Sequence, residues 1–365
     1  MQKEFVFGGL PMRVLFGHGT LERLPEEAER LGMRRPMVLS TPEQRADAEA
    51  LIARLDTLGA GGFFRATMHT PVDVTEAALA AVAEWKSDGL ICLGGGSTTG
   101  LSKAIALRTD LPQIAVPTTY AGSEMTPILG ETSNGEKRTQ RSDKVLPETT
   151  IYDVDLTLGL PAALSATSGL NAVAHAVEAL YAPDGNPVIS LMAEAAIGAM
   201  VAALPAVLAA PGDRHARAQA LYGAWLCGVC LGTVGMGLHH KLCHTLGGSF
   251  DLPHAPTHAV VLPYAVAYNA SAAPDAMAVL RRQLGSSDPA VALHELGRRL
   301  GAPASLGTLG LRESDLDRAA QLATERSYPN PRPLVRQAIR SLLDDALHGR
   351  TPRQTEAATA SGVGN

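Results

Sequence analysis

Five histidines lie close together in the second half of the chain, and no other stretch offers as much chemistry. The stretch Gly237–His258 reads GLHHKLCHTLGGSFDLPHAPTH and holds five of the 11 histidines in this chain of 365 residues. His240 and His244 are four residues apart, so on a helix their imidazoles share one face. Clustered imidazoles can act as acids and bases or bind a metal ion. The five are His239, His240, His244, His254 and His258.

Two helices must position these histidines. Gly247 and Gly248 are expected to end the first helix, because glycine tolerates the left-handed conformation of a helix C-cap. Pro253 then favours the start of a second helix near His254. Imidazoles from two helices would meet at one place, and a catalytic or metal site fits this pattern better than a set of unrelated surface histidines.

A glycine-rich turn is the second candidate site. Leu90–Lys103 reads LICLGGGSTTGLSK, an apolar strand that runs into glycines and then into a helix. Glycines let backbone N–H groups approach a phosphate, and the N-terminus of a helix adds partial positive charge. The turn is not GxGxxG, so a tight turn without a ligand stays open as an alternative. The candidate cofactor-binding residues are Gly95, Gly96, Ser97 and Thr98.

A further loop, AVPTTYAGSE, follows the next apolar strand. Its Thr118, Thr119 and Ser123 can offer hydroxyls at the carboxyl edge of a parallel sheet, where doubly wound folds bind nucleotides. Two such loops together favour nucleotide binding over two unrelated turns.

The order of strand-like and helix-like segments predicts the fold. Short apolar strands alternate with helices over the first part of the chain, which is typical of βαβ units and a parallel sheet. From Pro161 onward the pattern is helical, with alanine-rich runs such as AEAAIGAMVAALPAVLAA. We predict an α/β doubly wound dinucleotide-binding domain at 1–157, an all-helical catalytic domain at 158–349 with a cleft between the two, and a disordered tail at 350–365. The expected strands are Arg13–Phe16, Pro36–Ser40, Gly62–Met68, Gly89–Leu93, Gln113–Pro117 and Thr150–Tyr152, and the expected N-terminal helices are Thr20–Leu31, Pro42–Leu58, Val74–Lys86 and Thr98–Arg108.

Composition and charge exclude several classes of function. The net charge of −5 argues against a nucleic acid partner, since phosphate binding needs a basic surface. No uninterrupted apolar run predicts a membrane span, and the N-terminal MQKEFVFGGLPMRVLFG lacks the long apolar region of a signal peptide. Cys227 and Cys230 form a CxxC without a second pair, so we expect helix packing rather than a zinc or redox site. Reduced thiols fit a cytoplasmic protein.

An ordered set of motifs carries a resemblance to a known family. The motifs are GGGS, PTT…GSE, a helix with HAVEA, the H-x3-H…PH stretch, and SYPNPRP at Ser327–Pro333. Over nearly the whole chain this set resembles the iron-containing (group III) alcohol dehydrogenases. The resemblance implies a dehydroquinate synthase-like fold, with a dinucleotide-binding domain, a helical domain and an active site between them.

The resemblance also implies a divalent metal site in which one ligand has changed. Members of the family hold the metal with an Asp and a His on one helix and two further His. His175, His240 and His254 match the three His, but Asn171 stands where the family has Asp. The metal would lose its only anionic ligand, so we expect no tightly bound metal. His244 matches a His that lies beside the nicotinamide in metal-dependent members.

Other departures resemble one branch of the family, the maleylacetate reductases. Gly100 stands where the family's glycine turn usually has Asp, and the PTT loop is one residue short and carries Tyr120. GGGSTTGLSKAIA, VPTTYAGSEMTPILGET, LPETTIYDVDLTLGLP and HHKLCHTLGGSFDLPHAPTHA all look like that branch. The implied reaction is the reduction of maleylacetate, or a chloro-substituted form, to 3-oxoadipate in the breakdown of aromatic compounds.

The remaining candidate residues follow from this resemblance. Thr41 stands where a NAD-selecting Asp would lie, which leaves both NADH and NADPH open. Other positions on the cofactor side are Thr70, Lys137 and Leu156. A small dianionic substrate needs basic or N–H partners, and the candidates are Tyr120, His258, Lys241 and Arg332. We expect a homodimer.

Two other functions stay open. A metal-dependent alcohol dehydrogenase acting on a small aldehyde would require Asn171 to serve as a metal ligand. A metal-binding or storage module would take up metal without nucleotide affinity, and would leave the GGGS and PTT loops unexplained.

Overall fold

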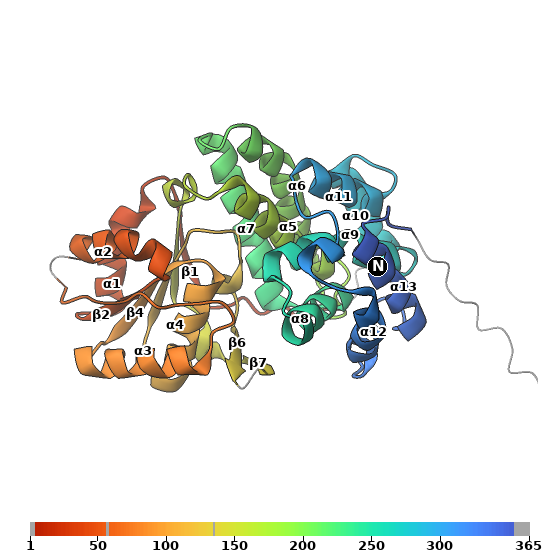
Figure 1. The fold of residues 1–365 in the computed structure, drawn as a ribbon. Coiled ribbons are helices and arrows are strands. Elements are labelled where there is room, and N and C mark those ends of the chain that lie inside the picture. Colours follow the sequence, from red (N-terminus) through yellow and green to blue (C-terminus); the bar gives the residue numbers. More distant parts are fainter. Residues whose placement is uncertain (1–3, 56–57, 134–135, 354–365) are drawn as a thin grey trace, which may run out of the picture.

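The structure, a computed structural model, describes residues 4–55, 58–133 and 136–353. A sheet-containing N-terminal part is followed by a helical C-terminal part (Figure 1). This arrangement confirms the predicted fold class. Strand β8 ends at Asp153 and helix α5 begins at Ala162, so the change falls around the predicted boundary at 157/158. The division into domains at that position stays a prediction.

A six-stranded parallel sheet forms the centre of the N-terminal part. Its order is β1-β8-β5-β4-β2-β3. From β2 the chain moves outward to β3, and from β4 it moves the other way to β5 and β8. The direction reverses between β2 and β4, and the carboxyl ends of strands at such a point are where open α/β sheets bind ligands. The strands are β1 (Arg13–Gly17), β2 (Pro36–Leu39), β3 (Gly61–Phe63), β4 (Gly89–Gly94), β5 (Gln113–Pro117) and β8 (Thr149–Asp153).

Helices cover both faces of this sheet (Figure 1). Consecutive residues of a strand point to opposite faces. Ile91 and Leu93 of β4 pack in one apolar cluster with side chains from α1 and α2, and Leu90 and Cys92 pack in another with those from α3 and α4. Burial on both faces explains why these strands are unbroken apolar runs in the sequence. The four helices are α1 (Leu24–Arg30), α2 (Arg45–Arg54), α3 (Val72–Trp85) and α4 (Gly96–Thr109).

The predicted strand Gly62–Met68 is only partly a strand. Ladder pairing ends at Phe63, although the N–H of Ala66 still donates to the carbonyl of Ser40. At His69 and Thr70 the backbone then becomes left-handed, with φ of 65° and 47°. Side chains with a Cβ disfavour this conformation, so the sequence gives no signal for it.

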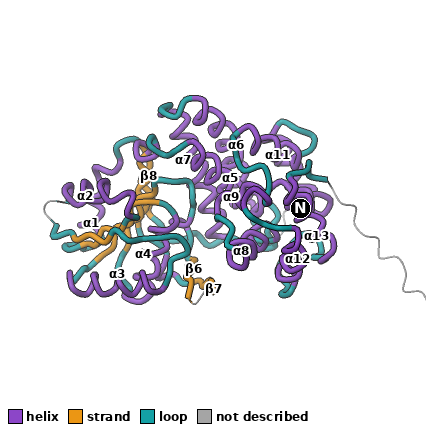
Figure 2. Tube along the Cα trace, in the orientation of Figure 1, coloured by secondary structure: helices purple, strands orange, loops and turns teal. Residues whose placement is uncertain are grey.

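A separate antiparallel hairpin was not expected from the sequence pattern. It consists of β6 (Ile128–Ser133) and β7 (Glu136–Arg141), drawn apart from the main sheet in Figure 2. The N–H of Thr132 donates to the carbonyl of Thr70, and Pro71 forms an isolated bridge with Thr132. The hairpin therefore supports the left-handed segment that precedes α3.

The C-terminal part is helical over its described residues, as predicted. Its main core lies where α5, α6, α7 and α9 pack together. Cys227 and Cys230 are free and buried in that core on α7, which confirms the helix-packing interpretation of the CxxC. The helices are α5 (Ala162–Ala179), α6 (Pro187–Ala209), α7 (Arg214–Thr233), α8 (Leu238–Phe250), α9 (His254–Asn269), α10 (Pro274–Leu284), α11 (Pro289–Arg299), α12 (Leu316–Thr324) and α13 (Arg336–His348).

Helix α6 is long and apolar enough to cross a membrane, with a mean hydropathy of 2.0 over its most apolar window. It packs against α5 and α7, and it buries Ile197, Met200 and Leu204. A core helix passes the same test, so this single helix is weak evidence for a membrane span.

The prediction that Gly247 and Gly248 end the first histidine helix is wrong. Helix α8 continues through both glycines to Phe250, and Asp251 adopts the left-handed conformation with a φ of 55°. The N–H of Leu252 donates back to the carbonyl of Leu246, and both leucines are buried. Burial of these apolar side chains outweighs the cost of two helical glycines, about 1 kcal/mol each. The predicted start of the second helix at His254 is confirmed.

The predicted tail begins with residues that contact the last helix. Arg350 pairs with Asp344 of α13, and Arg353 Nη2 lies 3.0 Å from Asp345 Oδ1. Residues 354–365, the rest of the predicted tail, lie outside the described residues.

Candidate active site

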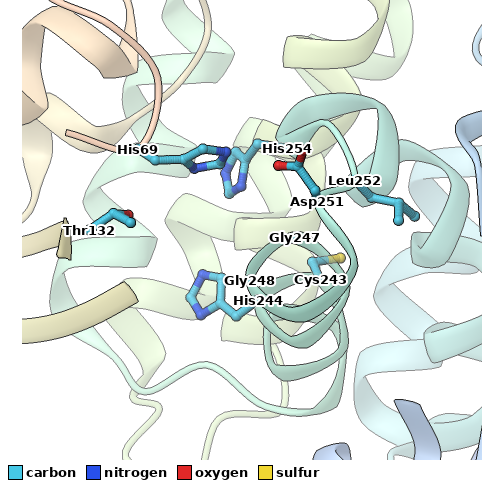
Figure 3. Close-up of a pocket in the computed structure, with 9 residues that line it drawn as sticks. All are labelled: His69, Thr132, Cys243, His244, Gly247, Gly248, Asp251, Leu252 and His254. Atoms are coloured by element: carbon cyan, nitrogen blue, oxygen red, sulfur yellow. The ribbon is translucent and has the colours of Figure 1, made fainter. Parts of the chain in front are cut away.

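A cavity of about 160 Å³ lies between side chains of the two parts of the chain (Figure 3). Two lining residues come from the N-terminal part, His69 before α3 and Thr132 on the hairpin. The others come from α8, α9 and the turn between them. They are Cys243, His244, Gly247, Gly248, Asp251, Leu252 and His254. The cavity has the position predicted for the cleft.

Imidazoles from three helices form a continuous cluster at and behind this cavity. The rings of His244 and His254 line it and are stacked with centroids 6.4 Å apart. Behind His254, the ring centroid of His258 lies 4.3 Å from that of His254, and the ring centroid of His240 lies 5.1 Å from that of His258. His175 of α5 lies 5.0 Å from His240. The structure therefore brings together the predicted imidazoles of α8 and α9 and adds one from α5.

Glu178 anchors the inner end of this cluster. Its Oε2 accepts a hydrogen bond from Nδ1 of His240 at 2.7 Å. The same carboxylate accepts the backbone N–H groups of Gly237 and His239 at the start of α8, at 3.0 and 2.8 Å. Glu178 thus directs Nε2 of His240 toward the other imidazoles and fixes where α8 begins. The sequence analysis missed this residue, although its spacing of three from His175 in HAVEA places both on one helical face.

Burial makes the inner imidazoles neutral. Loss of contact with water lowers the pKa of His175, His240 and His258 well below the usual value, and neighbouring imidazoles lower it further. His244 is exposed and His254 is half-buried. These two imidazoles are the members of the cluster that can contact a ligand in the cavity.

The metal ligands implied by the resemblance do not fit a tightly held dication. Asn171 Oδ1, His175 Nδ1 and His240 Nε2 are buried without a hydrogen-bond partner within the described part of the chain. All three are neutral, and Asn171 cannot supply the charge of an Asp. Among the described His, Cys, Asp and Glu residues, the ligand atoms that converge within 4.8 Å belong instead to His239, His240 and His258. The donor set therefore disfavours tight binding of iron or zinc at the four family positions.

The predicted cofactor residues gather at the carboxyl ends of β2, β4 and β5. Gly95 and Gly96 open helix α4 directly after β4. Thr118 follows β5, and its hydroxyl accepts a hydrogen bond from Nε2 of Gln44 at 3.0 Å. Gln44 belongs to the short turn after β2, whose first flanking residue is Thr41. The two predicted loops and this turn therefore meet where the strand order reverses.

The two glycines differ in what surrounds them. A Cβ on Gly95 would lie 2.9 Å from Oγ1 of Thr119, so the PTT loop itself requires a glycine there. A Cβ on Gly96 would meet only Ala121, at 3.8 Å. Gly96 is exposed and faces space that a ligand can use. Ser97 and Thr98 follow in the first turn of α4, where Thr98 is fully buried.

A buried lysine fixes the loop that carries Ser123. Nζ of Lys103 donates to the carbonyls of Ser123 and Thr126 at 2.6 Å each and to that of Ile128 at 3.0 Å. Burial lowers the pKa of Lys103 to about 7. Lys103 therefore stabilises the loop after β5, and the sequence analysis did not assign it a role.

The remaining cofactor candidates are more scattered. The backbone of Lys137 pairs with cavity-lining Thr132 in the hairpin. Thr70 is buried, and its side chain fills the position that a Cβ on Gly100 would take. Leu156 lies in the turn after β8 and packs against the cluster beneath α1 and α2.

Tyr120 does not contact the cavity, contrary to the prediction. Its side chain is fully buried in the helical core, and its hydroxyl lies 3.3 Å from Nη1 of Arg217. Arg217 is itself buried and donates to the hydroxyl of Ser165 and the carbonyl of Leu160. Tyr120 therefore joins the PTT loop to the helical part.

Arg332 is also a structural residue rather than a cavity residue. It is buried, donates to the carbonyl of Tyr268 at 3.2 Å and stacks 4.5 Å over the ring of Tyr268. Its neighbour Asn330 accepts the N–H of Leu238 at 3.3 Å, so the SYPNPRP segment holds the start of α8. Lys241 is half-buried on α8 and is not among the residues lining the cavity. His258 lies behind His254, in the second layer of imidazoles.

Comparison with known proteins places the chain in a class. The model of the iron-containing alcohol dehydrogenases matches residues 11–154, and that of the C-terminal part of the Fe-containing alcohol dehydrogenase family matches residues 165–347. The chain belongs to the iron-containing alcohol dehydrogenase family. This confirms the resemblance stated above.

Individual relatives are more specific. The chain is 58% identical over 350 residues to the maleylacetate reductase of Rhizobium sp. strain MTP-10005, covering 96% of this chain and 99% of the relative. The crystal structure of maleylacetate reductase from Agrobacterium tumefaciens superposes with a TM-score of 0.93 at 56% identity, covering 96% of this chain and 100% of that one. An iron-containing alcohol dehydrogenase from Corynebacterium glutamicum has a TM-score of 0.90 at 40% identity, with coverage of 95% and 98%.

Proposed function

We propose that this protein reduces maleylacetate, or a chloro-substituted form, to 3-oxoadipate with NADH or NADPH. The observation that carries the proposal is the cavity in which His244 and His254 face His69 and Thr132. Maleylacetate reductases of Rhizobium, Pseudomonas and Burkholderia are 58%, 52% and 53% identical to this chain over 99% of their own length. The location we propose is the cytoplasm, and the assembly a homodimer.

The chemistry follows from the electronic structure of the substrate. Its carbon–carbon double bond is conjugated to a ketone, so hydride from the nicotinamide adds to the alkene carbon beta to that ketone. The electron pair of the double bond moves toward the ketone oxygen and forms an enolate. A proton then adds to the alpha carbon, the cofactor leaves oxidised, and 3-oxoadipate results.

The cavity imidazoles supply what this reaction needs. N–H groups of His244 and His254 can donate to the oxygen on which charge develops, and such donors are most effective where water is excluded. One of the two can also deliver the proton to the alpha carbon. The neutral His258, His240 and His175 behind them keep positive charge out of the second layer and hold the outer rings in place.

We propose that turnover needs no metal. A metal at the family site would act as a Lewis acid on the ketone oxygen. Here the four implied ligands, Asn171, His175, His240 and His254, carry no negative charge. An enolate with imidazole N–H donors has another source of stabilisation.

The cofactor would lie along the edge formed by Gly95, Gly96 and Thr118, with its ribose toward Thr41. Glu43 lies two residues beyond Thr41, and hydrogen bonds from its own backbone N–H and from the Thr41 side chain lower the pKa of its carboxyl. This exposed carboxylate was not considered in the sequence analysis. It would disfavour the 2′-phosphate of NADPH without excluding it.

The test is a steady-state assay of the purified protein with maleylacetate and either NADH or NADPH. Loss of reduced cofactor and formation of 3-oxoadipate are measured together, and a small aldehyde is the competing substrate. We expect turnover of maleylacetate with both cofactors and little turnover of the aldehyde. Aldehyde reduction that requires added iron or zinc, without maleylacetate turnover, would instead identify a metal-dependent alcohol dehydrogenase.

A further inference from the structure

No lysine or arginine lies among the nine described residues that line the cavity. The charged side chain among them is Asp251, an exposed carboxylate that would repel an anion. The predicted partners Tyr120 and Arg332 are engaged in the core instead. Within this described lining, the groups that can bind a dianionic substrate are therefore imidazole N–H groups, the hydroxyl of Thr132 and backbone N–H groups.

His69 is the one lining imidazole that comes from the N-terminal part. Its ring points toward that of His254 in Figure 3, and both rings line the cavity. The other two lining imidazoles, His244 and His254, belong to the helical part. A substrate between His69 and His254 would therefore contact both parts of the chain at once.

The backbone that presents His69 is strained. His69 and Thr70 are consecutive residues with a Cβ in the left-handed region, at φ of 65° and 47°. Such a residue is unfavourable and persists only where the surroundings hold it. Strain of this kind concentrates at functional sites.

Three contacts hold this conformation. The carbonyl of Thr70 accepts the N–H of Thr132, and Pro71 bridges to the same residue. The Thr70 side chain packs into the space left by the missing Cβ of Gly100. The fold therefore maintains an unfavourable backbone conformation at His69, and this conformation places the His69 imidazole in the cavity wall.

We propose that His69 binds a carboxylate of the substrate and so sets the specificity of the site for a dianion. This inference rests on the proposed function, because it is that reaction which makes the substrate a dianion. Imidazole N–H groups donate well to carboxylates, and such charge-assisted bonds are about twice as strong as neutral ones. His69 is a substrate-binding residue and takes no part in hydride or proton transfer.

The test replaces His69 with glycine, which removes the imidazole and suits a left-handed backbone. We expect H69G to raise KM for maleylacetate roughly tenfold or more, to change kcat by less than roughly threefold, and to leave KM for NADH unchanged. The melting temperature should not fall, because the substitution relieves strain. A purely structural His69 would give the opposite pattern, a lower melting temperature with an unchanged KM, and would overturn the proposal.

Lys86→Gly is the matched control. Lys86 is an exposed residue at φ 54° at the end of α3, so it receives the same relief of backbone strain away from the cavity. K86G should leave KM for maleylacetate unchanged. A rise in KM equal to that of H69G would mean that backbone relaxation, and not loss of the imidazole, is responsible.

Ester substrates identify the carboxylate. The H69G penalty should disappear for one of the two monomethyl esters of maleylacetate, in which the bound carboxylate is no longer an anion. An equal penalty on the diacid and both esters would overturn the proposal. If the wild-type protein does not reduce maleylacetate, the proposed function fails on its own. In that case the role of His69 is still tested by calorimetry, which measures the affinity of the dianion 3-oxoadipate for NAD+-loaded wild type and H69G. Equal affinities would overturn the proposed role of His69.

Discussion

Oε2 of Glu178 lies 2.7 Å from Nδ1 of His240, and both side chains are buried. One carboxylate thereby orients an inner imidazole and also receives the first N–H groups of α8, the helix that carries His244 into the cavity. Loss of the Glu178 charge should therefore disturb the histidine cluster more than the predicted cofactor site, which is built on β2, β4 and β5.

We therefore expect Glu178→Gln to lower kcat on maleylacetate roughly tenfold or more, as is typical when the partner that orients a functional His is removed. NADH affinity, measured by titration, should be unchanged. Glu178→Ala should also destabilise the protein by several kcal/mol, because buried N–H groups of Gly237 and His239 lose their acceptor. Glu194→Gln, at an exposed ion pair on α6, is the control. A wild-type kcat in the Gln variant would contradict the orienting role.

Substitutions at the two glycines of the turn should distinguish an effect on cofactor binding from an effect on folding. Gly96→Ala places a methyl group 3.8 Å from Ala121, an ordinary contact, so the melting temperature should stay within a few degrees of wild type. The methyl group should still weaken NADH binding by preventing close approach of the phosphates. Gly95→Ala should affect both, because Thr119 must move. Unchanged NADH affinity in G96A would remove the turn from the cofactor site.

Cofactor choice should depend on charge near Thr41. With Thr41 in place, we expect NADH and NADPH to differ by less than roughly a hundredfold in kcat/KM. Thr41→Asp should penalise NADPH selectively, because its carboxylate would meet the 2′-phosphate. Glu43→Gln should shift the ratio the other way. Steady-state kinetics with both cofactors measure each effect, and an equal loss with both in T41D would place Thr41 away from the ribose.

Metal removal should leave activity intact. Dialysis against a chelator should not reduce turnover of maleylacetate, and Asn171→Asp should raise iron or zinc affinity without raising that turnover, because it restores an anionic ligand. Metal analysis and rate are measured on the same dialysed sample. Activity that disappears with the chelator and returns with iron or zinc would contradict metal-free turnover.

Acid should destabilise the protein through its buried imidazoles. Burial lowers the pKa of His175, His240 and His258 in the folded state, so below about pH 6.5 the unfolded chain binds more protons than the folded one. The contribution of these three neutral imidazoles to stability is complete above that pH. It is lost as the pH falls toward their lowered pKa values in the folded state. Each proton contributes about 1.4 kcal/mol per pH unit. Burial also lowers the pKa of His239, which adds to this trend. Burial raises the pKa of the Glu178, Glu124 and Glu148 carboxyls, which opposes it.

Urea unfolding between pH 7.5 and 5.5 measures the effect, a range set by the ordinary His value of about 6.5. We expect stability to fall across it. His258→Asn should make the fall shallower, because one buried titrating group is removed. A slope that is the same in this variant and in wild type would show that His258 is not a source of the acid sensitivity.

The sequence by itself determined the order of the main strands and helices and the inclusion of several histidines in the candidate site. Strands buried on both faces are continuous apolar runs, and helices repeat their apolar residues with their own period, so both can be recognised locally. His240, His244 and His254 could be assigned because each stands at a fixed place in a contiguous motif. The same is true of Gly95 and Gly96, which follow directly from a strand.

Only the tertiary structure decided which side chains face the cavity. Tyr120 lies in a loop that the sequence predicts to bind the cofactor, yet it points into the helical core toward Arg217. Glu178 reaches α8 across 62 positions of sequence, and no local pattern encodes that pairing. His69 enters the cavity because Thr132, from a hairpin with little apolar signal, holds a left-handed backbone in place. Such contacts depend on how distant segments pack, and packing energy at long range overrides local preference.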